Sequence, residues 1–152
     1  MEHRCSAAEE IWVAAGVYKP NKIAGNGTTD RDKAFLPPSH IKIYGSFAGT
    51  ETSLEQRDLS NPANRSILSG DFNDNDVVTG SGETLSISGN EENASRVVIL
   101  MHTTNTVLDG FTIKGGNAIG SNDIRIGTYT LNNDDGAGIY GYQADARIVN
   151  CI

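Results

Sequence analysis

The side chains most able to bind a metal ion lie in the acidic hexapeptide DFNDND, residues 71–76. Asp71, Asn73 and Asn75 alternate as in the first half of an EF-hand loop, whose carboxylate and amide oxygens suit Ca²⁺. The second half departs from that pattern, because Asp76 replaces the loop glycine and Gly82 replaces the bidentate glutamate. The sequence therefore leaves two interpretations, a solvated acidic turn or a calcium site formed by Asp71, Asn73, Asn75 and Asp76.

A second set of residues has the chemistry of sugar recognition. Tyrosine rings offer a flat apolar face with a polar end, and charged side chains offer hydrogen bonds to hydroxyl groups. Such residues border the polar stretch 117–135. The predicted glycan contacts are Asp123, Arg125, Tyr129 and Tyr142.

No complete catalytic set is visible in the sequence. A glycoside hydrolase needs two carboxylates at a defined separation, and stacked coils could bring Asp109 close to Asp145 or Asp135, but no spacing selects such a pair. The Gly136–Gly141 segment matches G-x-G-x-x-G, yet it lacks the preceding strand and following helix that a dinucleotide site requires. We therefore favour a protein without catalytic activity.

The elements that must position these residues are short strands organised around the stretch NTVLDGFTIKGG, residues 105–116. Its β-branched and aromatic residues favour strand, and Asp109-Gly110 introduces a bend. A related pattern follows 40 positions later, where Ile148 matches Leu108 and Cys151 matches Phe111; the same offset aligns Tyr140 with the inward Leu100. A strand–bend–strand unit that cannot bury its own face is typical of coils stacked on copies of themselves.

The remaining sequence fits a single all-β domain over residues 1–152. Residues 1–20 are predicted to form an N-terminal cap, with a helical turn over Ser6–Glu10 that begins at a capping box. Two polar stretches, Gly49–Asn64 and Asn117–Asp135, are predicted to lie outside the coils, because coils accept insertions at their turns.

Charge and hydropathy exclude several classes of protein. The chain of 152 residues has a net charge of −7 and no cluster of lysine and arginine, which argues against nucleic acid and anionic membranes as partners. No apolar run approaches the roughly 20 residues of a transmembrane helix, so membrane insertion is not expected. The N-terminus lacks the apolar core of a signal peptide, which indicates a removed export signal or none.

Several strings resemble one known family. IWVAAGVY, HIKIYGSFAGTETSLEQRDLSNPANRSILSGD, NTVLDGFTIKGGNA and GAGIY are similar to the N-terminal part of bacterial right-handed parallel β-helix surface proteins of the pectin-lyase-like superfamily. The resemblance implies a right-handed parallel β-helix, an extracellular or cell-surface location, and a polysaccharide as partner. It leaves two functions open: a non-catalytic glycan- or surface-associated module, or the N-terminal fragment of a polysaccharide lyase or glycoside hydrolase whose active site lies elsewhere.

The last strand of the chain predicts self-association. Val149, Cys151 and Ile152 form an apolar β-run with no following turn, in mid-coil by comparison with the family. Stacked coils expose unpaired backbone groups and an apolar interior at an uncovered end. We therefore expect the C-terminal coil to pair with a second copy, most simply as a symmetric end-to-end dimer.

Overall fold

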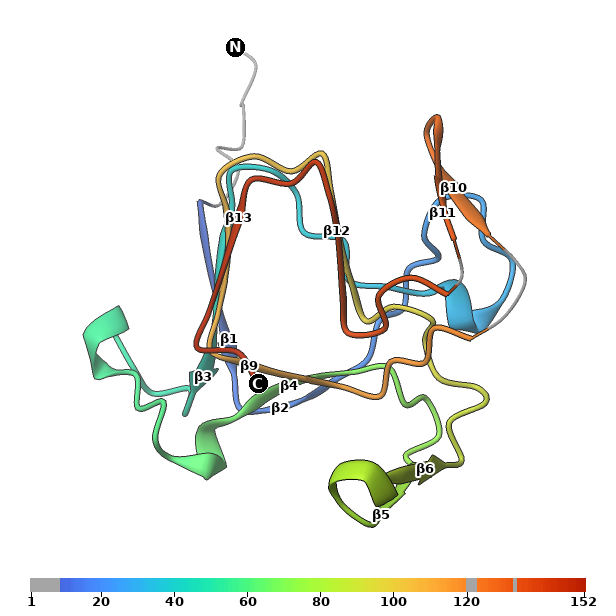
Figure 1. Ribbon diagram of the computed structural model, residues 1–152. Helices are drawn as coiled ribbons and strands as arrows, with labels where there is room; N and C mark the ends of the chain where they lie inside the picture. The colour runs from blue at the N-terminus through green and yellow to red at the C-terminus, as the bar shows by residue number, and fades with distance from the viewer. Residues whose placement is uncertain (1–8, 120–122, 133) are drawn as a thin grey trace.

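The computed structural model describes residues 9–119, 123–132 and 134–152 (Figure 1). Within these ranges the chain consists of short β-strands and turns, interrupted by single-turn 3₁₀ helices and by no α-helix. The protein is therefore all-β, as its sequence predicts. The 3₁₀ turns are η1 (Asp30–Asp32), η2 (Leu54–Gln56), η3 (Pro62–Asn64) and η4 (Gly82–Thr84).

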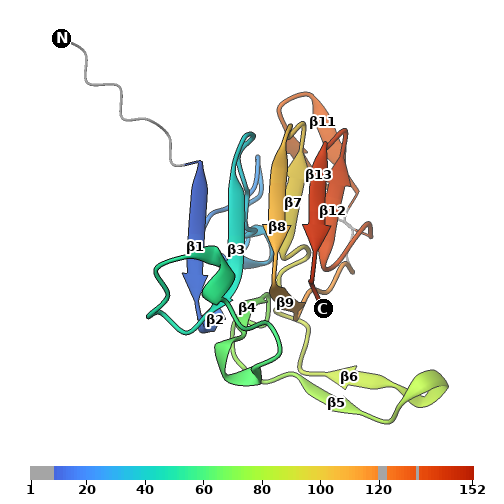
Figure 2. The ribbon, with the colours of Figure 1, turned by 90° about the vertical axis from the view of Figure 1, so that its left-hand side faces the viewer.

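Most strands stack in three parallel ladders around a common interior, which Figure 1 shows along the stack and Figure 2 from the side. None of these sheets closes on itself. The first ladder has the order β1 (Glu10–Ala14), β3 (Lys42–Phe47), β8 (Thr106–Asp109), β13 (Ala146–Val149). The second has β2 (Gly16–Tyr18), β4 (Ser66–Ser69) and β9 (Phe111–Lys114), and the third pairs β7 (Val98–Met101) with β12 (Ile139–Tyr142).

The corner between the first and second ladders requires a left-handed backbone. Gly110 separates β8 from β9 with a φ of 79°, and Asn150 takes the same corner one coil later with a φ of 51°. Glycine adopts this conformation freely and asparagine tolerates it. At the preceding corner Ser46 has a φ of 65°, and its hydroxyl donates to the carbonyl oxygen of Gly110 at 2.8 Å. This hydrogen bond joins two successive corners.

The predicted 40-residue repeat between β8 and β13 is confirmed. Leu108 pairs with Ile148 in register, and the amide of Ile152 donates to the carbonyl oxygen of Phe111 at 3.0 Å. Phe111 is buried and Cys151 packs against the same apolar cluster. Ile148 continues the inward column of Leu108 but remains 47% exposed, because no strand of the described residues covers β13 on its outer side.

The same offset fails in the third ladder. Tyr140 pairs with Ile99, and Gly141 pairs with Leu100, so this register is shifted by one residue from the predicted one. A shift of one residue moves a side chain to the opposite face of a sheet. The prediction that Tyr140 points inward is therefore wrong, and its ring packs outside the coils against the cluster that contains Ile99.

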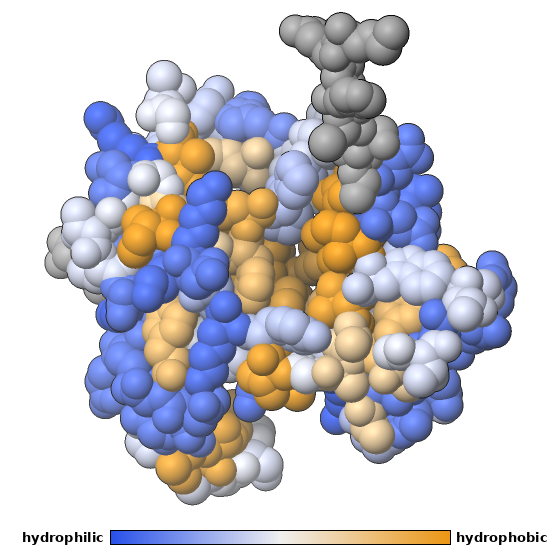
Figure 3. Space-filling view, turned by 180° about the vertical axis from the view of Figure 1, so that it is seen from behind, coloured by the Kyte–Doolittle hydropathy of each residue, from blue (hydrophilic) through white to orange (hydrophobic). Residues whose placement is uncertain are grey.

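The interior of the coils is mostly apolar, and buried polar side chains such as Ser66 bond to the backbone of a neighbouring coil. The buried members of its core are Leu68, Val97, Val98, Leu100, Leu108 and Phe111. A cavity of about 210 Å³ lies among the side chains of the first three coils, where Val13, Ile43 and Phe35 contribute to its wall. The cavity opens toward the β1 end, where Figure 3 shows a hollow bordered by hydrophobic residues.

Most of the predicted N-terminal helical turn over Ser6–Glu10 lies outside the described residues. Ser6 lies outside them, and Glu10 begins β1 instead of ending a helical turn. Within the predicted cap of residues 1–20, Glu10–Ala14 and Gly16–Tyr18 form β1 and β2, the strands of the first coil. These strands pair with β3 and β4 of the next coil.

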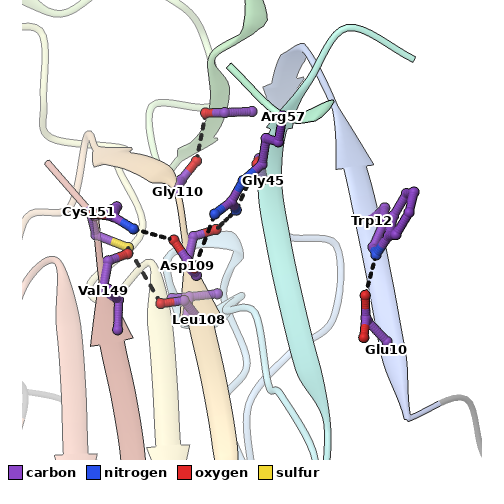
Figure 4. A network of polar contacts seen from close by, with 11 residues as sticks. Glu10, Trp12, Gly45, Arg57, Leu108, Asp109, Gly110, Val149 and Cys151 are labelled. Atoms are coloured by element: carbon purple, nitrogen blue, oxygen red, sulfur yellow. Dashed lines mark hydrogen bonds and ion pairs between the residues drawn. The ribbon is translucent and has the colours of Figure 1, made fainter. Parts of the chain in front are cut away.

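The predicted loop over Gly49–Asn64 lies outside the coils and is attached to them by Arg57 (Figure 4). Arg57 forms an ion pair with Asp109 at 3.1 Å, and both side chains are largely buried. Its guanidinium also donates to the carbonyl oxygen of Gly45 and lies over the ring of Tyr44. Asp109 accepts a further hydrogen bond from Asn150 at 2.9 Å, so this network joins the loop to two coils.

Two antiparallel hairpins project from the coils. The first consists of β5 (Val77–Thr79) and β6 (Ser86–Ser88), and the second of β10 (Ile124–Ile126) and β11 (Tyr129–Leu131). The second hairpin falls within the predicted polar excursion 117–135, whose described residues lie outside the coils. It nevertheless buries Ile124 and Leu131 in an apolar cluster of its own, so this segment is packed rather than merely solvated.

Replacing the central core aromatic should destabilise the coils strongly. Phe111→Ala is expected to lower the free energy of unfolding by about 3–5 kcal/mol, because the buried ring is removed and a cavity remains. Val78→Ala, at a position 61% exposed on the first hairpin, is the control and should change it by less than about 0.5 kcal/mol. Urea denaturation followed by circular dichroism measures both. Equal effects of the two variants would contradict the assigned core.

Candidate functional site

Three aromatic side chains from distant parts of the sequence meet outside the third ladder. The ring centroid of His102 lies 4.4 Å from that of Tyr129 and 5.6 Å from that of Tyr142, and the two tyrosines are 5.2 Å apart. His102 is exposed and the tyrosines are half-buried. We refer to His102, Tyr129 and Tyr142 as the aromatic cluster.

Parallel pairing places two members of the aromatic cluster side by side. Met101 and Tyr142 pair at the ends of β7 and β12, and the amide of His102 donates to the carbonyl oxygen of Tyr142 at 3.0 Å. His102 has a φ of 51°, which turns the chain at the end of β7. No local sequence signal identifies this residue, because its place depends on the pairing of strands 41 positions apart.

The third member, Tyr129, comes from the second hairpin. In its antiparallel register Ile124 faces Leu131 and Ile126 faces Tyr129, so these four side chains share one face. That face packs on the outside of the third ladder, where Ile124 and Leu131 join Ile99, Ala24 and Ala34 in a buried apolar cluster. Tyr129 is thereby positioned by apolar packing at the opposite end of the hairpin.

The buried guanidinium of Arg96 holds the segment that follows the second hairpin against the coils. Arg96 is 2% exposed, and it donates hydrogen bonds to the carbonyl oxygens of Asp135 and Asn132. Its guanidinium lies 5.3 Å from the centre of the Tyr140 ring. Burial lowers the pKa of Arg96 from its usual high value. Because a buried charge is costly when unpaired, these carbonyl and aromatic contacts are needed to retain it.

The structure brings together only part of the predicted glycan set. Tyr129 and Tyr142 belong to the aromatic cluster. Arg125 alternates with Ile124 and Ile126 and therefore lies on the opposite face of the hairpin, where its side chain contacts the Thr130 hydroxyl at 3.4 Å. Asp123 is exposed immediately before β10. The candidate site thus consists of the aromatic cluster, with Arg125 on the other face of the hairpin and Asp123 preceding it.

Two of the predicted calcium ligands, Asp71 and Asp76, accept hydrogen bonds from other groups of the protein. Asp71 is 4% exposed and accepts hydrogen bonds from the amides of Asn75 and Asp76. Both carboxylate oxygens of Asp76 accept from the Asn93 side chain, and Asp74 pairs with Lys19 at 2.7 Å. No group of three acidic, histidine or cysteine residues suited to a metal ion occurs among the described residues. Calcium binding by Asp71, Asn73, Asn75 and Asp76 stays a prediction.

The carboxylate pair considered for hydrolysis is separated by the strand register. Asp145 precedes the Ala146–Thr106 pair, and its carboxylate contacts the amide of Asn105, whereas Asp109 lies at the far end of β8. Four residues of strand correspond to about 13 Å, more than the roughly 5–9.5 Å of hydrolase carboxylates. Asp109 also forms an ion pair with Arg57. This pair cannot serve as the two carboxylates of a glycosidase.

Comparison with known proteins identifies no relative. No family model matches the chain, and neither does any curated protein or solved structure. In the part of the chain that the structure describes, no helix is long and apolar enough to cross a membrane.

The acidic loop provides a direct test of metal binding. Because its carboxylates already accept hydrogen bonds from the protein, millimolar Ca²⁺ is expected to leave the Tm unchanged. A ligand that binds only the folded state must raise the Tm. A rise with Ca²⁺ that is absent with Mg²⁺ and is abolished in the Asp74→Asn/Asp76→Asn variant would contradict this expectation and establish the site.

Proposed function

We propose that this chain is a non-catalytic carbohydrate-binding module built on the N-terminal coils of a right-handed parallel β-helix. The parallel ladders and the 40-residue register between β8 and β13 support the architecture. Right-handedness follows from general chirality, because about 98% of crossovers between parallel strands of one sheet are right-handed.

The single observation that carries the binding function is the aromatic cluster. Three rings within 4.4–5.6 Å of one another form a continuous surface with polar edges. Sugar rings present C–H groups that pack on aromatic faces and hydroxyl groups that hydrogen-bond to tyrosine and histidine. Because His102, Tyr129 and Tyr142 are held by strand pairing and apolar packing, little side-chain entropy has to be lost on binding.

The net charge of −7 favours a neutral or weakly charged glycan over a polyanion, because like charges repel at long range. Arg125 lies on the opposite face of the hairpin, so the ligand contacts the three rings and not this side chain. An extracellular or cell-surface location follows for such a module, since polysaccharides are found there, and agrees with the sequence resemblance.

Tyrosine replacement tests the proposal. Tyr142→Ala and Tyr129→Ala should each weaken binding about tenfold, equivalent to about 1.4 kcal/mol, because each removes one ring from the surface. Arg125→Ala is the matched control on the opposite face of the hairpin and should change the Kd less than threefold. Calorimetry with neutral and uronate-containing oligosaccharides measures these constants.

The same oligosaccharides separate the module from a lyase or a hydrolase. Binding without products supports the proposal. Unsaturated or shortened products, detected by absorbance and by chromatography, would contradict the non-catalytic assignment. Unchanged affinity in both tyrosine variants would contradict the aromatic cluster as the binding surface.

A further inference from the structure

A polar pocket of about 320 Å³ lies between the first hairpin and the end of β9. Its lining includes Asp71, Asp74 and Asp76, together with Val78 and Ile87 of the hairpin. The lining residues that the structure describes all lie between positions 71 and 116, so internal segments of the chain form this pocket. Ligand pockets in proteins begin at about 300 Å³, and this one therefore suits a small ligand or a single side chain.

The segment that contributes most of the pocket is acidic. Residues 71–95 contain six acidic residues and no lysine or arginine. Lys114 is the one basic residue in the described part of the lining, and Lys19 pairs with Asp74 from outside it. The local charge therefore favours a cation as the ligand.

The polar groups of the pocket are hydrogen-bond acceptors that the protein satisfies only in part. A carboxylate has about four acceptor positions, but Asp71 accepts from two backbone amides and Asp76 from one side-chain amide group. That group belongs to Asn93, which lines the same pocket and is 1% exposed. The Oδ1 atom of Asn93 has no hydrogen-bond partner in the described part of the chain. Because an unsatisfied buried oxygen is costly, a donor is missing at this wall.

The hairpin adds an apolar wall to these acceptors. Val78 and Ile87 pair across β5 and β6 and therefore share one face of the hairpin. They are 61% and 46% exposed, and both line the pocket. Apolar side chains beside carboxylates suit a ligand whose positive charge is attached to an aliphatic chain.

We infer that this pocket binds a primary ammonium group carried on an aliphatic chain. An ammonium group has three N–H donors and no acceptor, so it supplies both the charge and the donors that the pocket lacks. Its chain packs on Val78 and Ile87. A calcium ion fits less well, because it requires about six to eight oxygen ligands in direct contact, whereas an ammonium group uses only the acceptor positions that remain open. A free alkylamine and the lysine side chain of a polypeptide share this chemistry.

Three cations of equal charge test the pocket in the 152-residue chain. n-Butylamine represents the free amine, Nα-acetyl-lysine methylamide represents a lysine side chain, and tetramethylammonium has no N–H donor. In ¹H–¹⁵N NMR titrations, both amines should shift the side-chain amide signals of Asn93 and the backbone amide signal of Gly115 in a saturable manner. Tetramethylammonium should bind about fivefold more weakly or less, because it cannot form charge-assisted hydrogen bonds. Tighter binding of the lysine derivative identifies a polypeptide as the source, and equal affinity of the two amines identifies a free amine.

Matched variants locate the site. Asp76→Asn removes a carboxylate from the pocket and should weaken n-butylamine binding about fivefold. Glu83→Gln removes the same charge from η4, outside the pocket, and should change the affinity by less than about twofold. Val78→Ser should weaken n-butylamine more than methylamine, because only the longer chain reaches the apolar wall. Thermal unfolding of each variant verifies that it is folded.

Two kinds of result would overturn the inference. Equal affinity for n-butylamine and tetramethylammonium, or equal effects of Asp76→Asn and Glu83→Gln, would indicate a general attraction of cations to an acidic surface. Unchanged signals of Asn93 and Gly115 with both amines would show that the pocket accepts no ammonium group.

Discussion

The strands of the three ladders depend on hydrogen bonds to the strand one coil away. The strands of the three ladders contain only three to six residues, too few to bury an apolar face or to be stable alone. Stacking resolves both problems at once, because each added coil pairs the free backbone edge of the preceding coil and covers its apolar column. Leu108 and Phe111 are buried for this reason, whereas Ile11 and Ile148, with a neighbour on one side only, remain half exposed.

The loop over Gly49–Asn64 and the second hairpin are inserted at corners of the coils, and side-chain contacts hold each of them against the stack. Arg57 attaches one loop through Asp109 and the carbonyl oxygen of Gly45, and Arg96 attaches the second hairpin through the carbonyl oxygens of Asn132 and Asp135. A guanidinium suits this task because it has five donors and can satisfy several carbonyl oxygens at once. The hairpin also requires apolar packing of its own, and Leu131 is fully buried outside the coils.

Two kinds of surface result from this arrangement, and they offer different chemistry. The sides of the stack bear corner residues and insertions, so polar and aromatic side chains such as His102 and Tyr129 gather there without disturbing the interior. The interior, by contrast, offers apolar side chains to the neighbouring coil. The sides of the stack are therefore where a ligand with polar and apolar faces can be bound.

The sequence by itself determined the all-β class, the bend at Gly110 and the register of Ile148 on Leu108, because these follow from local backbone preference and the side chains of one short repeat. It also indicated Tyr129 and Tyr142 as aromatic residues beside polar stretches, but neither their contact nor the participation of His102. The contact between these rings depends on the third ladder, where paired residues are 41 positions apart and Tyr140 consequently points outward. It also depends on the apolar packing of the second hairpin. Insertions of different length separate the strands of each ladder, so no fixed period in the sequence encodes these contacts. Only the stacked tertiary structure, which aligns backbone hydrogen bonds rather than sequence positions, decided them.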